Sequence, residues 1–312
     1  MQNEIRRVPV LASPVYQEKA IMLEGKDGVA IFKNLQGKVR GGFSWGENPQ
    51  NMATSLDTDG RALENTREWM GKLHLPSQII RILSSDTKGP EGNNGVLEVT
   101  QEVVDGYSTE HGKGDVTTSA DFIYTKDPRF TLMVKPADCP SVIVYAKNKK
   151  GEHIVGVGHW GREGVDAMNP MLAMTHLLAK EEEGGEECDP STIYIGIAPG
   201  IGPQYHTLTY EEIIPSQEGL PSKLLHWSRW GNRLTGPDAG PEPYTQKRYH
   251  IDLLGRIIDL IDRRIPRNHI EANRQDTYSL AAKGLAFSHR YSLVNKVSEG
   301  RMVVAAALPF LL

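Results

Sequence analysis

Two side chains that can bind a metal ion stand at the ends of apolar segments that are neighbours in the sequence. Cys139 follows the run TLMV and a Pro-Ala-Asp turn, and His159 closes the run HIVGVG and opens the glycine-flanked segment HWGREG. Strand ends beside glycine turns are where α/β proteins commonly place their chemistry. A thiol and an imidazole that meet there can bind a metal ion or act as a nucleophile–base pair.

Each residue also has an ordinary structural interpretation. A lone cysteine is more often a small buried hydrophobe than a ligand, and a lone histidine at a strand end is often only hydrogen-bonded. Asp138 and Pro140 flank Cys139, which indicates that the strand has ended and that the thiol lies at its rim. A thiol there becomes reactive when a cation or a metal ion lowers its pKa.

The spacing of possible ligands excludes the common zinc motifs. Neither CxxC nor HExxH is present, so ligands would come singly from separate strands. That arrangement is typical of a catalytic zinc ion with three protein ligands and one open position. The glycine-rich segment after His159 can also present backbone N–H groups at a helix start, which suits an anion such as phosphate.

Composition limits the classes of protein and of partner. The chain has 312 residues, 39% hydrophobic and 24% charged, which is ordinary for a globular protein. The net charge of −4 gives no electrostatic support for binding nucleic acid or acidic membranes. Two cysteines make no disulfide framework, and the apolar tail MVVAAALPFLL is shorter than the ~20 residues that span a bilayer. We therefore expect a cytoplasmic protein with a small-molecule substrate.

The apolar runs predict an α/β fold. DFIYT, FTLMV, SVIVYA and HIVGVG are predicted to form one central sheet, with helices near 60–75, 169–183 and 253–265. RGGFSWGENPQNMATSLDTDG is interpreted as loop, LAFSHRY and RMVVAAAL as the last strands, and 216–248 as an irregular insertion. Because the elements do not alternate regularly, we expect a single domain over 1–312 with mixed β-sheets and flanking helices.

Several motifs resemble one family. PADCP, GHWGREG and APGIGPQYHTL resemble the patterns T-A-D-C-x-P, H-A-G-W-R-G and G-P-A-I-G-x-x-x-Y-E of the YfiH-like, laccase-domain family. SADFIYT, RQDTYS, FSHRYS and EGRMVVAAAL resemble further family motifs, and the matches keep their order from about Gly41 to Leu308. The family is also called multicopper polyphenol oxidoreductases and is now mostly regarded as purine nucleoside phosphorylases.

The resemblance implies one zinc ion bound by a cysteine and two histidines. Matched by position, the cysteine is Cys139 and the second histidine is His159. The place of the first histidine holds Asp86, whereas the string TEHG offers His111 instead. Both can ligate zinc, and imidazole suits such a site better. Copper is the less favoured metal, because one cysteine and scattered histidines cannot supply several copper sites.

The chain departs from the family where a phosphate clamp is expected. The W-R of the family's W-R-G is Arg162 and Glu163 here, and the glutamate of its Y-E is His206. The residues that remain for phosphate or substrate contacts are Arg162, Arg290, Arg301 and His206. Each arginine can equally form an ordinary surface ion pair.

The resemblance implies a zinc-dependent purine nucleoside phosphorylase or adenosine deaminase-like enzyme, with purine nucleoside and phosphate as substrates. Cys139, His159 and Asp138 are the expected catalytic residues, and Asp138 or His206 would transfer protons. One alternative is a catalytically degenerate metal- or ligand-binding member. Another is a metal-free Cys/His hydrolase acting on a peptidoglycan precursor.

Overall fold

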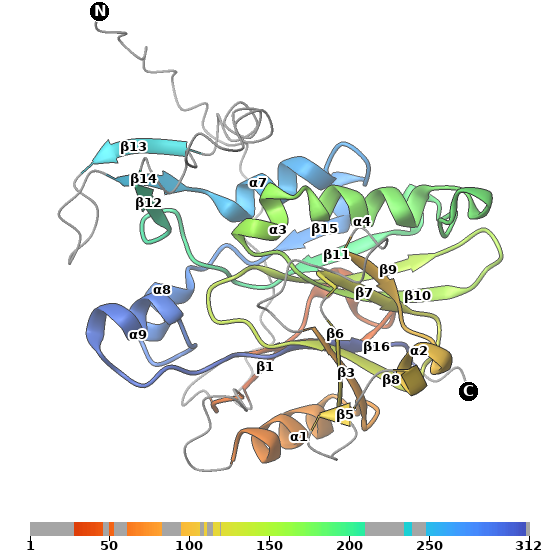
Figure 1. Ribbon diagram of the computed structural model, residues 1–312, viewed down its shortest axis with the longest axis horizontal. Coiled ribbons are helices and arrows are strands. Elements are labelled where there is room, and N and C mark those ends of the chain that lie inside the picture. Colours follow the sequence, from red (N-terminus) through yellow and green to blue (C-terminus); the bar gives the residue numbers. More distant parts are fainter. Residues whose placement is uncertain are drawn as a thin grey trace, which may run out of the picture.

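Two β-sheets packed face to face form the centre of the molecule (Figure 1). The computed structural model describes residues 28–45, 50–52, 61–82, 95–106, 109–110, 115–118, 120–209, 234–238 and 248–309. The large apolar core between the sheets takes side chains from both, including Phe43 and Leu132 from one and Ile143 and Val155 from the other. The expected α/β fold with mixed sheets and flanking helices is confirmed.

The first sheet has seven strands in the order β1-β2-β16-β8-β3-β6-β5. Its central strand β8 pairs in parallel with β3 and antiparallel with β16, so the sheet is mixed. The strands are β1 (Val29–Ala30), β2 (Arg40–Ser44), β3 (Gln78–Ile82), β5 (Thr109–Glu110), β6 (Asp115–Thr118), β8 (Phe130–Val134) and β16 (Val304–Ala307). Strand β8 is buried throughout and apolar except for Thr131, whose hydroxyl donates to the carbonyl of Pro76.

The second sheet has six strands in the order β15-β11-β9-β10-β7-β4. They are β4 (Val96–Glu98), β7 (Phe122–Thr125), β9 (Ser141–Lys147), β10 (His153–His159), β11 (Tyr194–Ile197) and β15 (Ile270–Ala272). Strands β9 and β10 form an antiparallel hairpin in which Ser141 lies opposite His159 and Lys147 opposite His153. A three-stranded sheet of β12 (Thr207–Thr209), β14 (Arg248–Ile251) and β13 (Leu234–Asp238) lies apart from these two.

Helices cover the outer faces of both sheets, which gives the layered body seen in Figure 1. On the second sheet lie α3 (Arg162–Asp166), α4 (Asn169–Leu178) and α7 (Leu253–Ile261), and on the first lies α1 (Ala62–Lys72). Helix α7 begins where the Asp252 side chain accepts from the N–H of Gly255, and its apolar residues face the sheet at helical spacing. Further short helical segments are α2 (Gln101–Gly106), η1 (Lys33–Leu35), η3 (Glu181–Glu183), η4 (Pro190–Thr192) and η5 (Arg267–His269).

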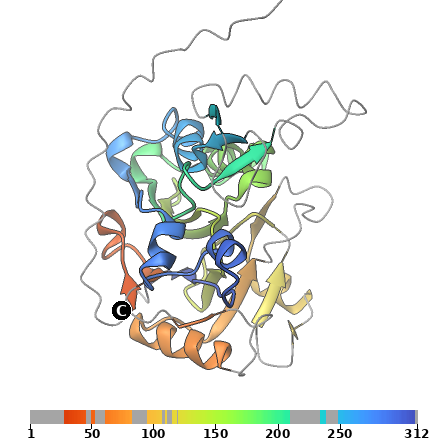
Figure 2. The same cartoon turned by 90° about the vertical axis from the view of Figure 1, so that its left-hand side faces the viewer.

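Two short helices close one end of the sheets, where Figure 2 shows them side by side. They are α8 (Thr277–Ala282), capped by the Asp276 carboxylate, and α9 (His289–Asn295), capped by the Ser288 hydroxyl. Among the helices that the structure describes, none has the length and apolar character to cross a bilayer.

Three predictions about elements are wrong. The four apolar runs do not share one sheet, because FTLMV forms β8 in the first sheet while the other three lie in the second. RGGFS is strand β2, not loop; its two glycines allow close approach to β16 and β1. The expected strand in LAFSHRY is replaced by the start of α9, because Ser288 supplies a helix cap. Most of the expected insertion at 216–248 lies outside the described residues, and the 1–312 domain bounds stay a prediction.

Candidate functional site

The β9–β10 hairpin brings Cys139 and His159 to the same end of the second sheet. His159 is the last residue of β10 and lies opposite Ser141, the first residue of β9. Cys139 precedes Ser141 by two residues. The residues that follow them, Pro140 and Trp160, are hydrogen-bonded to each other, since the N–H of Trp160 donates to the carbonyl of Pro140 at 3.0 Å. Strand register therefore positions both side chains.

Gly161 leaves room for the two side chains to meet. A Cβ atom at this position would lie 2.8 Å from the Cys139 sulfur and 3.4 Å from Cε1 of the His159 ring. Gly161 has a φ of −67°, which any residue adopts, so space and not backbone freedom requires glycine here. Sulfur and imidazole therefore converge on one point at the start of α3.

Both converging groups are held in their neutral forms by their surroundings. Burial of the thiol, with the negative charge of Asp138 beside it, raises the pKa of Cys139 to about 12. Burial lowers the pKa of His159 to about 4, and the positive charge of Arg301 acts in the same direction. At neutral pH the pair is thus a thiol and a neutral imidazole, and a thiolate requires additional positive charge nearby.

Asp138 connects the segment of Cys139 to α8 and α9. One carboxylate oxygen accepts from the Thr277 hydroxyl at 2.7 Å and the other from the backbone N–H of Arg290 at 2.8 Å. Its backbone carbonyl accepts from the N–H of Ile201 at 2.8 Å. These contacts favour a positioning role for Asp138, and its expected part in proton transfer stays a prediction.

Three of the residues expected to contact phosphate lie close enough to interact electrostatically. Burial, together with the positive charges of Arg290 and Arg162, lowers the pKa of His206 to about 3. Within the described part of the chain, the buried Nδ1 of His206 has no hydrogen-bond partner. The guanidinium of Arg162 lies 3.9 Å from Glu163, whose side chain is largely exposed.

Arg301 belongs to the Cys139 side of the site. Its charge affects the pKa of both Cys139 and His159. The same guanidinium pairs with Glu299, which also accepts from His289 at 2.9 Å. The structure thus groups the expected cations in two places, with Arg162 and Arg290 near His206 and Arg301 near the thiol and imidazole.

Asp121 lies at the site and was not predicted from the sequence. Its carbonyl accepts from the N–H of His159 at 2.8 Å, and its buried carboxylate accepts from Asn169. Burial raises the pKa of Asp121 to about 6, the Asn169 hydrogen bond opposes the rise, and Glu163 adds to it. The available signal was an acidic residue between Ala120 and Phe122 at the start of an apolar strand.

The donor chemistry at this point fits a zinc ion. A cysteine sulfur and a neutral imidazole nitrogen are the ligands that zinc prefers. A third protein ligand would be needed, and both candidates, His111 and Asp86, lie outside the described residues. In the ranges that the structure covers, no group of three or more His, Cys, Asp or Glu side chains is suited to hold a metal ion.

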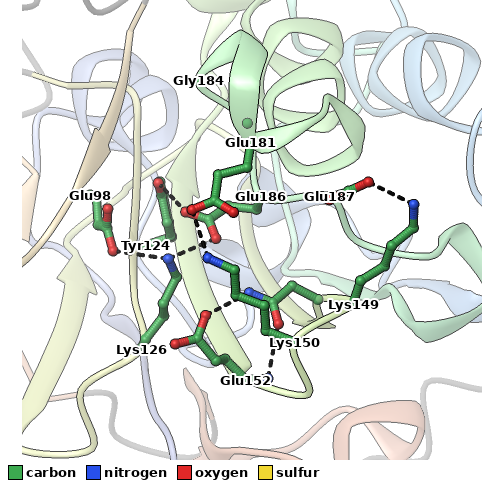
Figure 3. A pocket seen from close by; sticks show the side chains of 12 residues that line it. Glu98, Tyr124, Lys126, Lys149, Lys150, Glu152, Glu181, Gly184, Glu186 and Glu187 are labelled. Atoms are coloured by element: carbon green, nitrogen blue, oxygen red, sulfur yellow. Dashed lines mark hydrogen bonds and ion pairs between the residues drawn. The ribbon is translucent and has the colours of Figure 1, made fainter.

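A separate pocket of about 230 Å³ lies at the opposite end of the same hairpin (Figure 3). Its walls carry three lysines and five glutamates, namely Lys126, Lys149, Lys150, Glu98, Glu152, Glu181, Glu186 and Glu187. Each lysine is paired with a carboxylate, as the dashed lines in Figure 3 show. The lysine charges are therefore paired within the pocket, where the carboxylates outnumber them, and the pocket contributes none of the residues around Cys139.

These features define an α/β protein in which a thiol and an imidazole from one hairpin meet at the start of a helix. The chain belongs to the multi-copper polyphenol oxidoreductase laccase family, whose model matches residues 39–309. No curated protein sequence matches the chain significantly.

Solved structures share the fold. YlmD from Geobacillus stearothermophilus matches with a TM-score of 0.65 and 21% identity, over 93% of this chain and 99% of YlmD. The hypothetical protein YfiH from Bacillus licheniformis matches with a TM-score of 0.60 and 18% identity, over 86% of this chain and 92% of YfiH. A protein from Neisseria meningitidis matches with a TM-score of 0.55 and 15% identity, over 86% of this chain and 91% of that protein. The resemblance to YfiH-like proteins is confirmed.

Proposed function

We propose that the chain is a zinc-dependent enzyme of the YfiH-like family that acts on purine nucleosides, with phosphate or water as the second substrate. The observation that carries the proposal is the convergence of the Cys139 sulfur and the His159 ring on one point beside Gly161. The purine and phosphate specificities come from the family resemblance. Phosphorolysis would join a phosphate oxygen to C1′ of the ribose and release the purine base with a proton.

Cys139 and His159 would hold the metal, with His111 or Asp86 as the third protein ligand. Bound zinc supplies a Lewis acid that polarises a water or phosphate oxygen, and its charge favours the thiolate. Neutral imidazole is already the form in which His159 can donate to a metal.

The arginines would bind the phosphate. Arg162 and Arg290 lie near the buried His206, and guanidinium groups match phosphate oxygens geometrically. His206 is neutral at pH 7 and, with a pKa of about 3, is a weak base, so its ring would hydrogen-bond to the substrate while the two arginines carry the charge.

The metal-free Cys/His hydrolase is the weaker alternative. Such an enzyme needs a thiolate beside a basic imidazole, whereas a pKa of about 12 for Cys139 and about 4 for His159 keeps both neutral. One observation favours the degenerate binding protein instead. Glu163 stands where the family has arginine, is exposed, and raises the pKa of Cys139.

Turnover and metal content test the proposal together. Purified protein loaded with zinc is incubated with inosine or adenosine and phosphate, and free base, ribose 1-phosphate and inosine are measured by chromatography. We expect about one zinc per chain and release of the base. Cys139→Ala should lose both, whereas Cys188→Ala, which alters the other free cysteine, should keep both. A protein that binds zinc but forms no product favours the degenerate binding protein. A protein that neither binds zinc nor forms product rejects the proposal.

A further inference from the structure

Three tyrosine rings form a continuous aromatic cluster that the proposed chemistry does not use. The rings of Tyr205 and Tyr278 are stacked with centroids 3.9 Å apart and planes 12° apart. Tyr291 meets Tyr278 edge to face at 5.2 Å and 78°. Tyr278 is the middle ring, so Tyr205 and Tyr291 are the outer ones. All three are half-buried, so part of each residue is open to solvent.

The cluster is assembled by the segments that hold Asp138. Tyr205 follows β11 in the turn whose Ile201 N–H donates to the Asp138 carbonyl. Tyr278 adjoins Thr277, whose hydroxyl donates to the Asp138 carboxylate, and Tyr291 adjoins Arg290, whose N–H donates to the other oxygen. Since Asp138 directly precedes Cys139, the aromatic cluster borders the thiol–imidazole site, at the end where Figures 1 and 2 show α8 and α9.

The cationic side of the site adjoins the same cluster. His206 directly follows Tyr205, and Arg290 directly precedes Tyr291. The charge of Arg290 reaches His206, so these two residues are themselves close. A phosphate ion held there would lie beside the tyrosines, next to the ribose of a nucleoside whose base is stacked on them.

We propose that Tyr205, Tyr278 and Tyr291 form the platform on which the flat base of a nucleoside substrate stacks. The base would stack on one of the outer rings, Tyr205 or Tyr291, with its sugar toward Cys139 and His159. An exposed tyrosine face binds an aromatic heterocycle by stacking and discriminates little between bases. The inference rests on the proposed function for the identity of the substrate and adds the residues that recognise the base.

Variants of the outer rings test the platform. Tyr205→Leu and Tyr291→Leu remove the aromatic faces, and the corresponding Phe variants keep them. Tyr194→Leu is the matched control, because Tyr194 is also half-buried and stacked, on His269 at 4.1 Å, but stands at the far end of β11. KM for inosine and for phosphate, kcat, hypoxanthine binding by calorimetry and the urea midpoint are measured for each zinc-loaded protein.

At least one Leu variant should raise KM for inosine and the Kd for hypoxanthine about tenfold, because stacking of one base contributes roughly that factor. KM for phosphate and kcat should change less than about twofold, and the Phe variants and Tyr194→Leu should resemble the wild type. If the urea midpoint of a Leu variant falls, its KM and Kd are compared with those of the Phe variant at the same position, which keeps the aromatic ring.

The outcomes separate the platform from the proposed function. Hypoxanthine binding that weakens in the Leu variants, in a protein without turnover, supports the platform and rejects the phosphorylase. Turnover with an unchanged KM for inosine and unchanged hypoxanthine binding in both Leu variants overturns the platform alone. A wild-type protein that neither binds hypoxanthine nor converts inosine overturns both.

Discussion

Asp138 accepts a 2.7 Å hydrogen bond from the hydroxyl of Thr277, a residue 139 positions further along the chain. The bond joins the loop that carries Cys139 to the first turn of α8. Thr277 is fully buried, so a side chain without the hydroxyl would place apolar surface against the Asp138 oxygen. The geometry around the thiol thus depends on a contact between the middle and the last quarter of the sequence.

Thr277→Val should destabilise the protein by about 1–3 kcal/mol, because it leaves one oxygen of Asp138 without its donor while keeping the side-chain shape. Urea unfolding measures the change. The control is Thr175→Val, where an exposed hydroxyl bonds only to the Met171 carbonyl of its own helix. That change should cost less than about 0.5 kcal/mol. Equal effects of the two substitutions would show that the Asp138 contact contributes no special stability.

Gly161→Ala should abolish zinc binding and turnover. Its Cβ would lie 2.8 Å from the Cys139 sulfur, so the sulfur must move away from the point that it shares with His159. Zinc content by elemental analysis gives the readout. Gly71→Ala in α1 is the matched control, since its Cβ meets nothing within 4 Å. There alanine should stabilise the helix by about 0.5–1 kcal/mol and leave zinc content unchanged. Full zinc occupancy in Gly161→Ala would contradict the shared point.

Stability should fall as the pH drops from 7 to 5, partly through His206. The pKa of this histidine is about 3 in the folded protein and near 6.5 in the unfolded chain, so between these values only the unfolded chain takes up the proton. The loss from His206 should be about 1–2 kcal/mol at pH 5. His159 acts in the same direction and Asp121, with its raised pKa, in the opposite one.

His206→Gln isolates this contribution. The difference in unfolding free energy between pH 7 and pH 5, measured in urea on metal-free protein, should be smaller in the variant by that amount. An unchanged pH dependence would mean that His206 is accessible to protons in the folded state.

Lys126→Met should destabilise the protein by about 1–3 kcal/mol, because it removes the cation 2.8 Å from the buried carboxylate of Glu186. The Tyr124 hydroxyl, at 2.7 Å, would be the remaining donor to this carboxylate. Lys149→Met breaks the more exposed pair with Glu187 and should cost less than about 1 kcal/mol. Thermal unfolding of both variants and of Lys126→Met/Glu186→Gln checks this. The double variant should recover part of the lost stability, because it no longer buries an unpaired charge at position 186. No recovery would mean that Lys126 stabilises the protein by something other than its ion pair with Glu186.

Local patterns were sufficient to predict the elements around the site. Cys139 and His159 each follow an apolar run that forms a strand, and Asp138 and Gly161 mark the turns. Their meeting could be predicted because the apolar runs SVIVYA and HIVGVG, which are joined by a short polar turn, form a hairpin that brings the start of the first run to the end of the second. Assignment of strands to sheets could not, since FTLMV is apolar in either sheet and its partners β3 and β16 lie far away in the sequence.

Residues whose role depends on burial were harder to predict. Asp121 is an ordinary aspartate in the sequence and acquires its raised pKa only because β7 and α4 enclose it. The tyrosine cluster draws on three separate segments, and no spacing in the sequence indicates that Tyr205 stacks on Tyr278. The LAFSHRY segment shows the converse case, where an apolar run suggested a strand and one serine cap favoured a helix.

Strand β16 occupies an interior position of the seven-stranded sheet, between β2 and β8. Without Val304–Ala307 the sheet would be divided into two part-sheets, β1-β2 and β8-β3-β6-β5, each with an edge strand whose backbone groups lack a partner. Pairing of these four residues with both neighbours closes the gap. Unpairing of β16 alone would therefore create two edges open to other chains.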